Sequence, residues 1–441
     1  MRWIHTSILI CGIIVVWSAA NIMWSGQHYK GIIKADGKGY YAHLPALFIY
    51  HDLNFGFFDS IEGGKFANDN YFYDYRKYEG GQTINKYYSG TALAMLPFFG
   101  LGHGISYVTG GDLDGYSKWY QISISLAGIA YFLATLYIMA LAMRKLGYGD
   151  RLIALITPAI VFGTNWYYYV VSEPAMSHVY SIFFISLFVY YSIKWAQGRG
   201  LKMPKMALLL GIIILIRPVN GLVVLTLPIF FHSIKDFLTA CKTEIKKTST
   251  LLISVVLTLA VVCIQLLIYK TQTGHYWIYS YENEGFNFTH PEILNILFSY
   301  KKGLMLYTPL FLLAVVGFMH IYRRNKWQGA SLASFMIILT YVLSSWWNWY
   351  YGGSFSSRVY IEYYIFFFWA LLAVMDGLKH KKVWKTLATT YIVLCICLCQ
   401  VQTFQYRHLI IHWDGMTKES YWGNFLKIER DTDPVNSVGD E

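Results

Sequence analysis

Apolar residues along the 441-residue chain form long runs that are separated by short polar segments. Many of these runs reach the length of about 20 residues that a helix needs to cross the hydrocarbon core of a bilayer. Five of the short segments between them are rich in lysine and arginine, which marks loops on the inner side of a membrane. The pattern predicts an all-α protein, a polytopic transmembrane helical bundle.

The basic loops set the direction of each crossing. They contain Arg144, Lys145 and Arg151; Lys194, Arg199, Lys202 and Lys205; Lys235, Lys242, Lys246 and Lys247; Arg323, Arg324 and Lys326; and Lys379, Lys381, Lys382 and Lys385. Because the runs between inner loops must cross out and back, we expect about eleven crossings with the N-terminus inside. Residues 1–404 then form the membrane domain, 25–121 its first outer loop, and 405–441 a short outer tail.

Two apolar stretches do not fit simple crossings. Residues 88–108 would reverse the parity of the basic loops, so we expect them to lie in the outer interface, as a second juxtamembrane helix after one near 36–52. Residues 206–232 lie between two inner loops and must go out and back. We therefore expect two short helices that meet at "RPVN", 217–220, where proline breaks the helix.

Composition supports a membrane protein, because 56% of the residues are hydrophobic and 14% are charged, whereas soluble domains have about 25% charged residues. The formal charge of +11 would suit nucleic acid, but the cations sit in the short loops, so we expect no nucleic-acid partner. The six cysteines lie in membrane runs and one inner loop, which implies no disulfide framework. Any chemistry is expected on the outer side.

Two acids of the outer loops are candidates. Asp36 stands beside Gly37 and Gly39, which permit a close backbone approach to a ligand, although Asp-Gly is also a common turn pair. Glu173 lies in the tight loop "SEPAMSH", 172–178, where it is either solvated or a ligand for a cation or a substrate. Carboxylate oxygens suit Mg²⁺ or Mn²⁺. His178 either adds a softer ligand or makes a local hydrogen bond.

Several outer cations stand close to membrane ends. Arg217 lies on the RPVN segment, where it either pairs with an anion or caps free helix carbonyls. Lys86 and Lys302 are further candidates, although Lys302 and its neighbour Lys301 would also suit lipid headgroups. Arg358 stands four residues before Glu362, so a local ion pair is the alternative to ligand binding.

The aromatic segment "WWNWYYGG", 346–353, is explained equally well by interfacial anchoring and by stacking on sugar rings. Asn348 would add a polar contact there. An acid that takes a proton, a second carboxylate and several cations on one membrane face fit group transfer from a lipid-linked phosphate donor.

In their order along the chain, these segments resemble the C-type glycosyltransferases (GT-C), the superfamily of protein O-mannosyltransferases, lipid A aminoarabinose transferases and oligosaccharyltransferases. "DGKGYYAHLPALFIYHD" resembles the catalytic acid and first juxtamembrane helix, and "GTALAMLPFFGLGHG" the second. "SEPAMSH", "LIRPVNG", "KKGLMLYTP" and "WWNWYYGGSFSSR" resemble later segments of bacterial members. Protein O-mannosyltransferases have two adjacent acids where Asp36 is followed by Gly37, which weakens the case for protein mannosylation.

The resemblance implies an inverting, polyprenyl-phosphate-sugar-dependent glycosyltransferase of the bacterial inner membrane, with its site at the outer face. It implies Asp36 as general base and Glu173 as a metal or substrate ligand, with a divalent cation bound by both as an open question. The residues expected to bind the donor phosphate are Lys86, Arg217, Arg358 and Lys302. Those expected to shape the sugar and acceptor pocket are Tyr40, Tyr41, His178, Trp347, Asn348 and Trp349. The rival hypothesis is a transporter or flippase of lipid-linked sugars, although the chain shows no convincing internal repeat.

Overall fold

The computed structural model describes residues 1–67, 73–199 and 203–429, and almost all of its regular elements are helices. The first half contains α1 (Arg2–Ala19), the π-helix η1 (Ala20–Trp24), the 3₁₀ helix η2 (His28–Gly31), α2 (Asp36–Phe48), α3 (Phe58–Ser60), the π-helix η3 (Ile61–Lys65), β1 (Arg76–Glu79), β2 (Gln82–Asn85), α4 (Gly90–Val108), α5 (Lys118–Lys145), α6 (Asp150–Phe162), α7 (Trp166–Ser172), α8 (Ser177–Ala196) and α9 (Met203–Ile216). The second half contains the 3₁₀ helix η5 (Pro218–Phe230), α10 (Ile234–Ile245), α11 (Thr248–Thr273), α12 (Ile293–Phe298), α13 (Leu304–Tyr307), α14 (Leu310–Arg324), α15 (Lys326–Ser344), the 3₁₀ helix η6 (Arg358–Tyr363), α16 (Tyr364–Gly377), α17 (Lys382–Arg407) and α18 (Lys418–Gly423).

Within the described residues, eight helical segments are long and apolar enough to cross a membrane, or nine if η5 and α10 form one bent span. They are Arg2–Trp24, Gly90–Val108, Lys118–Lys145, Ser177–Ala196, Thr248–Thr273, Lys326–Ser344, Arg358–Gly377 and Lys382–Arg407. This is consistent with a membrane protein, but the expected count of about eleven crossings is not confirmed. Some apolar runs form shorter helices: α6 has 13 residues and α14 has 15, which at 1.5 Å per residue span only about 20 Å.

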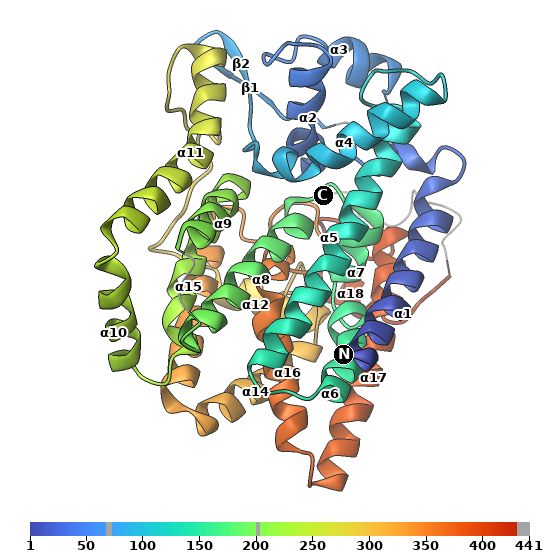
Figure 1. The fold of residues 1–441 in the computed structure, drawn as a ribbon. Coiled ribbons are helices and arrows are strands. Elements are labelled where there is room, and N and C mark those ends of the chain that lie inside the picture. Colours follow the sequence, from blue (N-terminus) through green and yellow to red (C-terminus); the bar gives the residue numbers. More distant parts are fainter. Residues whose placement is uncertain (68–72, 200–202, 430–441) are drawn as a thin grey trace.

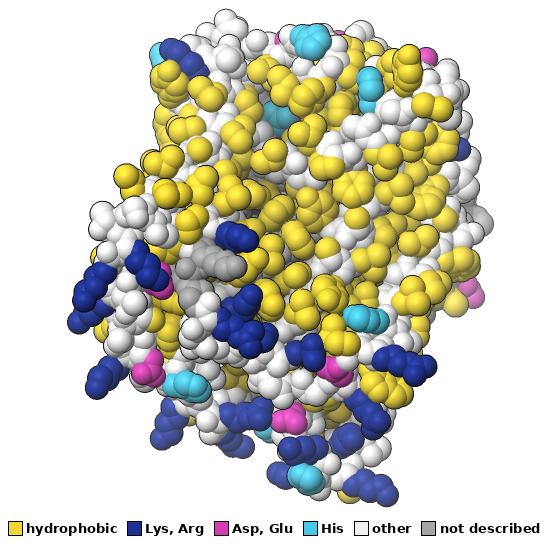
Figure 2. Space-filling view, in the orientation of Figure 1, with side chains coloured by type: hydrophobic (Ala, Val, Ile, Leu, Met, Phe, Trp, Pro, Cys, Tyr) yellow, Lys and Arg dark blue, Asp and Glu magenta, His cyan; other side chains and the backbone are white. Residues whose placement is uncertain are grey.

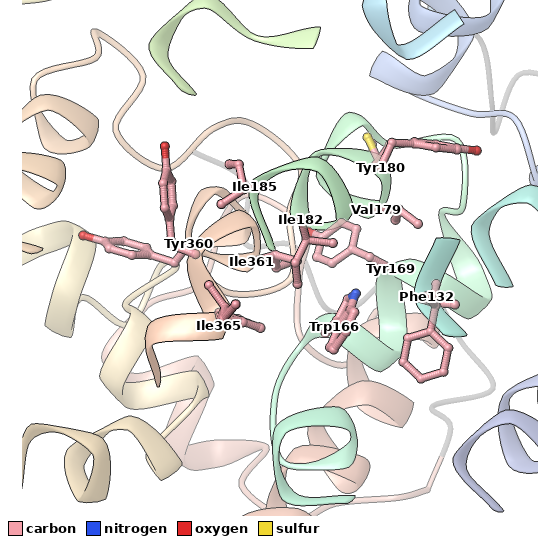
Figure 3. Close-up of a cluster of buried hydrophobic side chains, with 14 of the residues drawn as sticks. Phe132, Trp166, Tyr169, Val179, Tyr180, Ile182, Ile185, Tyr360, Ile361 and Ile365 are labelled. Atoms are coloured by element: carbon pink, nitrogen blue, oxygen red, sulfur yellow. The ribbon is translucent and has the colours of Figure 1, made fainter. Parts of the chain in front are cut away.

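The centre of the bundle is the helical segment η6–α16. Of the apolar window in Arg358–Gly377, 94% of the residues are buried inside the protein, whereas the corresponding value for α11 is 17%. Figure 3 shows part of the buried cluster around this segment, with Phe132 from α5, Trp166 and Tyr169 from α7, and Val179, Tyr180, Ile182 and Ile185 from α8; Ile182 lies beside Ile361. Residues at the start of η6 are therefore held in place from several sides.

The segment between η1 and α5 forms a separate layer at the upper end of the molecule in Figure 1. Helix α2 begins at Asp36, and α4 covers most of the stretch 88–108, so a helix is present at each of the two expected positions. Helix α4 packs against α2 and α5. It also meets the length and composition criteria for a span, so its expected place in the interface stays a prediction. The antiparallel hairpin β1–β2 is a small departure from the predicted all-α fold.

The RPVN segment interrupts the helix as predicted. Helix α9 ends at Ile216, Arg217 is extended with φ −153° and ψ 114°, and the 3₁₀ helix η5 begins at Pro218. Proline has no backbone N–H to continue the α-helical ladder, so it starts a new element instead. Helix α9 and η5 contact one another, which leaves Arg217 at the tip of a helical hairpin.

The two ends of the bundle differ in charge. Figure 2 shows hydrophobic side chains over most of the visible face and lysine and arginine gathered towards its lower end, opposite the α2–α4 layer of Figure 1. The basic residues that end α5, α8 and α14 belong to that lower end. Helix α17 continues to Arg407, and the ring of Tyr421 in α18 packs on those of Tyr300 and Tyr307; the expected outer tail 405–441 stays a prediction. Residues 430–441 of that tail lie outside the described residues.

Candidate functional site

A cavity of about 590 Å³, which we call the Asp36 cavity, lies at the end of the bundle that the α2–α4 layer covers. It is formed where the beginnings of α2, α8 and η6 meet the RPVN segment, the strand-to-helix turn after β2, and the loops around 281 and 347. The charged residues that line it are Asp36, Lys86, Arg217, Glu284 and Arg358. Cations outnumber acids in this lining, so the cavity favours an anionic ligand.

Glycines next to Asp36 let neighbouring segments come close to it. A Cβ atom on Gly37 would lie 2.8 Å from the Ala175 Cβ, and one on Gly39 would lie 2.2 Å from the Tyr87 ring. Both distances are too short for real atoms, so glycine is needed at each position. The sequence predicts a close approach to a ligand here; the close approach in the structure is to the protein itself, and it places Asp36 next to Tyr87.

The Asp36 carboxylate is bound at both oxygens. Its Oδ1 accepts a hydrogen bond of 2.8 Å from the Tyr87 hydroxyl, and its Oδ2 forms an ion pair with Nη2 of Arg358. Burial alone would raise the pKa of Asp36, but the positive charge of Arg358 and the Tyr87 hydrogen bond outweigh it and lower that pKa. Asp36 is therefore ionised at neutral pH, and 21% of its side chain stays exposed on the cavity side.

Arg358 carries a positive charge with unused hydrogen-bonding capacity. The residue is 7% exposed. Its Nη1 has the Met176 sulfur at 3.6 Å as a partner, and its buried Nε–H has no partner among the residues that the structure describes. A buried donor without an acceptor destabilises the folded protein by about 1–3 kcal/mol, and by more when the donor is charged. An anion in the cavity would relieve this cost.

Arg217 is held in a second buried group of charges. Its Nη1 donates a hydrogen bond of 3.0 Å to Oε1 of Glu362, and His178 Nδ1 lies 2.9 Å from the same oxygen. Arg217 therefore pairs with a side chain of η6 and does not cap free helix carbonyls. His178 likewise makes a long-range contact instead of the local one considered from the sequence. Both residues still line the cavity.

Lys86 and the aromatic rings form the remaining walls. Lys86 Nζ lies 2.6 Å from Oε1 of Glu284 and 5.4 Å from the centre of the Tyr281 ring. The Tyr40 and Tyr87 rings are 4.6 Å apart. Further aromatic and polar lining residues are Tyr73, Tyr88, Tyr279, Phe286, Trp346, Trp347, Asn348, Tyr351 and Trp413. Flat rings on several sides suit a ligand with an apolar face and polar edges, such as a sugar.

Four of the predicted site residues lie away from the cavity lining. Glu173 is 6% exposed; its Oε1 accepts a 2.8 Å hydrogen bond from Tyr168 and lies 3.4 Å from Lys34 Nζ. Tyr41 is buried, and its hydroxyl donates a hydrogen bond to the Gly115 carbonyl. Trp349 packs its ring on Tyr350.

Lys302 is the fourth, and its side chain is enclosed by the protein. It is 1% exposed, and its ammonium group donates to the carbonyl oxygens of Ser354 and Trp413. Burial lowers its pKa to about 7, against the opposing effect of Asp414. Because Trp413 lines the cavity, Lys302 supports one of its walls from behind.

The carboxylates do not form a metal site with the groups around them. Asp36 is paired with Arg358 and Glu173 with Lys34, so each negative charge already has a cationic side chain. Among the described residues, no group of three or more histidine, cysteine, aspartate or glutamate side chains lies together as metal ligands would. The two residues proposed from the sequence as cation ligands therefore do not fit that role in this arrangement.

Several residues of the site were not selected from the sequence. Tyr87, Tyr281, Glu284 and Trp413 line the cavity, and Glu362, considered from the sequence only as a local partner of Arg358, binds Arg217 behind it. Tyr87 directly follows Lys86 in the expected first outer loop 25–121, whereas Tyr281 and Glu284 lie in a polar segment between two apolar runs, so their position relative to those runs was the only available signal. Comparison with known protein-family models, curated proteins and solved structures finds no match to this chain.

Proposed function

We propose that the protein is an inverting glycosyltransferase that moves a sugar from a polyprenyl-phosphate-linked donor to a hydroxyl group of an envelope lipid, glycan or protein. The observation that carries this proposal is the placement of one ionised acid, Asp36, and three cations, Lys86, Arg217 and Arg358, on the walls of one cavity. Transfer of a sugar from a phosphate requires a base for the acceptor and a positive site for the leaving group.

In the proposed reaction, the acceptor oxygen attacks the anomeric carbon from the side opposite the phosphate, and its proton passes to Asp36. The bond between the anomeric carbon and the phosphate oxygen breaks, and its electron pair leaves with the polyprenyl phosphate. The added negative charge on that phosphate is stabilised by Arg358, Arg217 and Lys86. No step uses a metal ion, because the cationic side chains supply the positive charge.

Arg358 connects donor binding to the strength of the base. It is the strongest of the interactions that lower the pKa of Asp36. A donor phosphate in the cavity competes with Asp36 for the guanidinium group and takes up its free Nε–H. When Arg358 turns towards the phosphate, the pKa of Asp36 rises and the carboxylate becomes a better proton acceptor.

A lipid-linked donor suits the surroundings of the cavity. Helix α8, which begins beside His178, and the segment Arg358–Gly377 are both long and apolar enough to cross a membrane. A phosphate held at their upper ends leaves its isoprenoid tail level with the apolar outer helices of the bundle, such as α11, of whose apolar window only 17% is buried. We place the protein in the bacterial inner membrane with the Asp36 cavity on the outer, periplasmic face, in contact with membrane lipids.

The test compares whole-cell lipids and envelope glycans by mass spectrometry in strains of the producing organism. The strains lack the protein, or carry the wild type, Asp36→Asn or Asp112→Asn at matched membrane levels. Asp112→Asn is the control, because this acid belongs to the same layer but has a 67% exposed side chain and lies outside the cavity lining.

We expect the deletion and Asp36→Asn to lose the same sugar from one acceptor while its polyprenyl-phosphate form accumulates, and Asp112→Asn to match the wild type. If Asp36→Asn restores the wild-type glycans in full, Asp36 is not the base. The transferase mechanism then fails, and transport of a lipid-linked sugar by the same cavity becomes the better explanation.

A further inference from the structure

A second cavity, of about 390 Å³, lies at the other end of the bundle; we call it the Lys145 cavity. Helix α8 connects the two regions, because His178 near its start lines the Asp36 cavity and Ala196 at its end lines the Lys145 cavity. Its 20 residues rise by about 30 Å, the thickness of a bilayer's hydrocarbon core. The two cavities therefore lie at opposite surfaces of any membrane that the helix crosses.

The charges that line the Lys145 cavity are positive. Lys145 at the end of α5, Arg324 at the end of α14 and His232 after η5 are the titratable residues of its lining besides Tyr148, and none of the lining residues described is acidic. Within the described parts of the chain, no carboxylate pairs with Lys145. Arg324 lies 3.3 Å from Asp376, but 60% of its side chain remains exposed.

Polar hydrogen-bond donors add to this charge. The Tyr148 hydroxyl is buried and accepts a hydrogen bond of 3.1 Å from Trp369 Nε1, which leaves its own hydrogen free of any acceptor among the described residues. Asn325 caps the N-terminus of α15 and lines the cavity, so the positive end of that helix dipole points to the same place. Lys145 and Arg324 also lie at the C-termini of α5 and α14, where a positive charge interacts favourably with the helix dipole. That interaction does not require the cavity beside them.

We propose that the Lys145 cavity binds a phosphate-bearing anion, a chemistry that the headgroup of an anionic phospholipid and free phosphate share. Lys145 and Arg324 face the anion with opposite charge, and the Tyr148 hydroxyl donates a hydrogen bond to it. Basic cavities between the ends of membrane helices are typical binding sites for anionic headgroups. This site is independent of the sugar transfer proposed for the Asp36 cavity.

The experiment measures lipid retention by the purified, delipidated full-length protein with native mass spectrometry. The probes are phosphatidylglycerol, phosphatidylcholine and inorganic phosphate, each added separately, and then phosphatidylglycerol with phosphate in competition. The variants are Lys145→Gln, the double variant Lys145→Gln/Arg324→Gln, and the control Lys381→Gln/Lys382→Gln. The control removes two exposed cations from the start of α17, its N-cap Lys381 and its first residue Lys382, which do not line the cavity.

We expect the wild type and the control to retain one phosphatidylglycerol about ten times better than the double variant, with Lys145→Gln in between, and to retain phosphatidylcholine weakly. If inorganic phosphate displaces that lipid and raises the thermal midpoint of the wild type alone, free phosphate is the ligand; if it does neither, the ligand is the lipid headgroup. Equal retention of phosphatidylglycerol by the wild type and both cavity variants would overturn the proposal. An equal loss in the control would overturn it as well.

Discussion

Two arginine–carboxylate pairs stand side by side at the Asp36 cavity, and they differ in what surrounds the carboxylate. Glu362 is 1% exposed and is held by Arg217 and His178 from two sides. Asp36 is 21% exposed at its side chain and faces the cavity, while its partner Arg358 is the buried member. In the first pair the protein encloses the carboxylate, and in the second it encloses the arginine.

In the proposed function, this difference separates a structural pair from a reactive one. An enclosed carboxylate between two partners cannot meet a substrate, so Glu362 fixes the position of Arg217. An ionised carboxylate at a cavity wall can take a proton, and its arginine partner retains a free N–H for a second anion. The contrast predicts different effects of substitution on the activity of the folded protein and on its stability.

Asp36→Asn should have the largest effect on activity. Asparagine keeps the shape and can still accept the Tyr87 hydrogen bond, but it cannot take the acceptor proton. General-base catalysis contributes typically about 10²–10⁴-fold, so we expect sugar transfer to fall by about 10³-fold. The measurement is transfer rate per folded protein, with Asp112→Asn as control; a loss below about tenfold would contradict the assignment.

Arg358→Gln should come next, with a loss of about 10²-fold, because it removes one of the groups that stabilise the leaving phosphate. It also removes the charge that lowers the pKa of Asp36, so that pKa rises. Asp36 then becomes protonated at a higher pH, and the acidic limb of the pH–rate profile moves upward. Arg76→Gln, which removes a cation of the same layer paired with Asp59 and Asp74, should leave the profile unchanged.

Glu362→Gln should affect stability more than turnover. Removing one partner of a buried ion pair costs about 3–5 kcal/mol, because Arg217 is left without its counter-charge. We expect a lower thermal midpoint in detergent and a transfer rate per folded molecule within about tenfold of the wild type. Asp36→Asn also leaves a buried arginine, Arg358, without its counter-charge, so activity separates the two pairs. The transfer rate per folded molecule of Asp36→Asn should fall far below that of Glu362→Gln; the opposite ranking of transfer rates would refute the division into an enclosed and an open pair.

Lys302→Met should give the smallest effect, visible as a pH dependence of stability. Burial lowers the pKa of Lys302 to about 7 in the folded protein, below the value of 10.5 for an exposed lysine. Between these values the unfolded chain binds more protons, so the stability of the wild type rises as the pH increases above 7. The wild-type midpoint should therefore gain a few degrees on that of Lys302→Met between about pH 6 and 9. A difference that is constant with pH would contradict the buried charge.

The helices and the break at RPVN were predictable because they depend on local sequence: apolar runs, proline at 218, and glycines next to Asp36. The pairing of charges was not. Arg358 and Glu362 are four residues apart, a spacing that pairs side chains on an α-helix. Residues 358–363 form a 3₁₀ helix with about three residues per turn, so these two side chains point in different directions. Each pairs with a residue from a distant part of the chain.

The same reason explains Glu173 and Lys302. Both stand in segments whose side of the membrane could be predicted, but their direction depends on neighbours such as Tyr168 and Ser354 that only the fold brings together. Hydrophobic pattern selects the layer of a membrane protein in which a side chain lies. The hydrophobic pattern does not determine whether, within that layer, the side chain points into the cavity or into the protein interior.

The most direct test of the central claim is native mass spectrometry of Asp36→Asn purified from its membrane in mild detergent. If the cavity binds a sugar on a polyprenyl phosphate and Asp36 only accepts the proton, this variant retains the donor that it cannot consume. We predict an adduct with the mass of a polyprenyl-phosphate sugar on Asp36→Asn, and its loss in the double variant Asp36→Asn/Arg358→Gln. An Asp36→Asn protein without any phosphoprenyl adduct, or an adduct that is equally abundant after Arg358→Gln, would contradict the account.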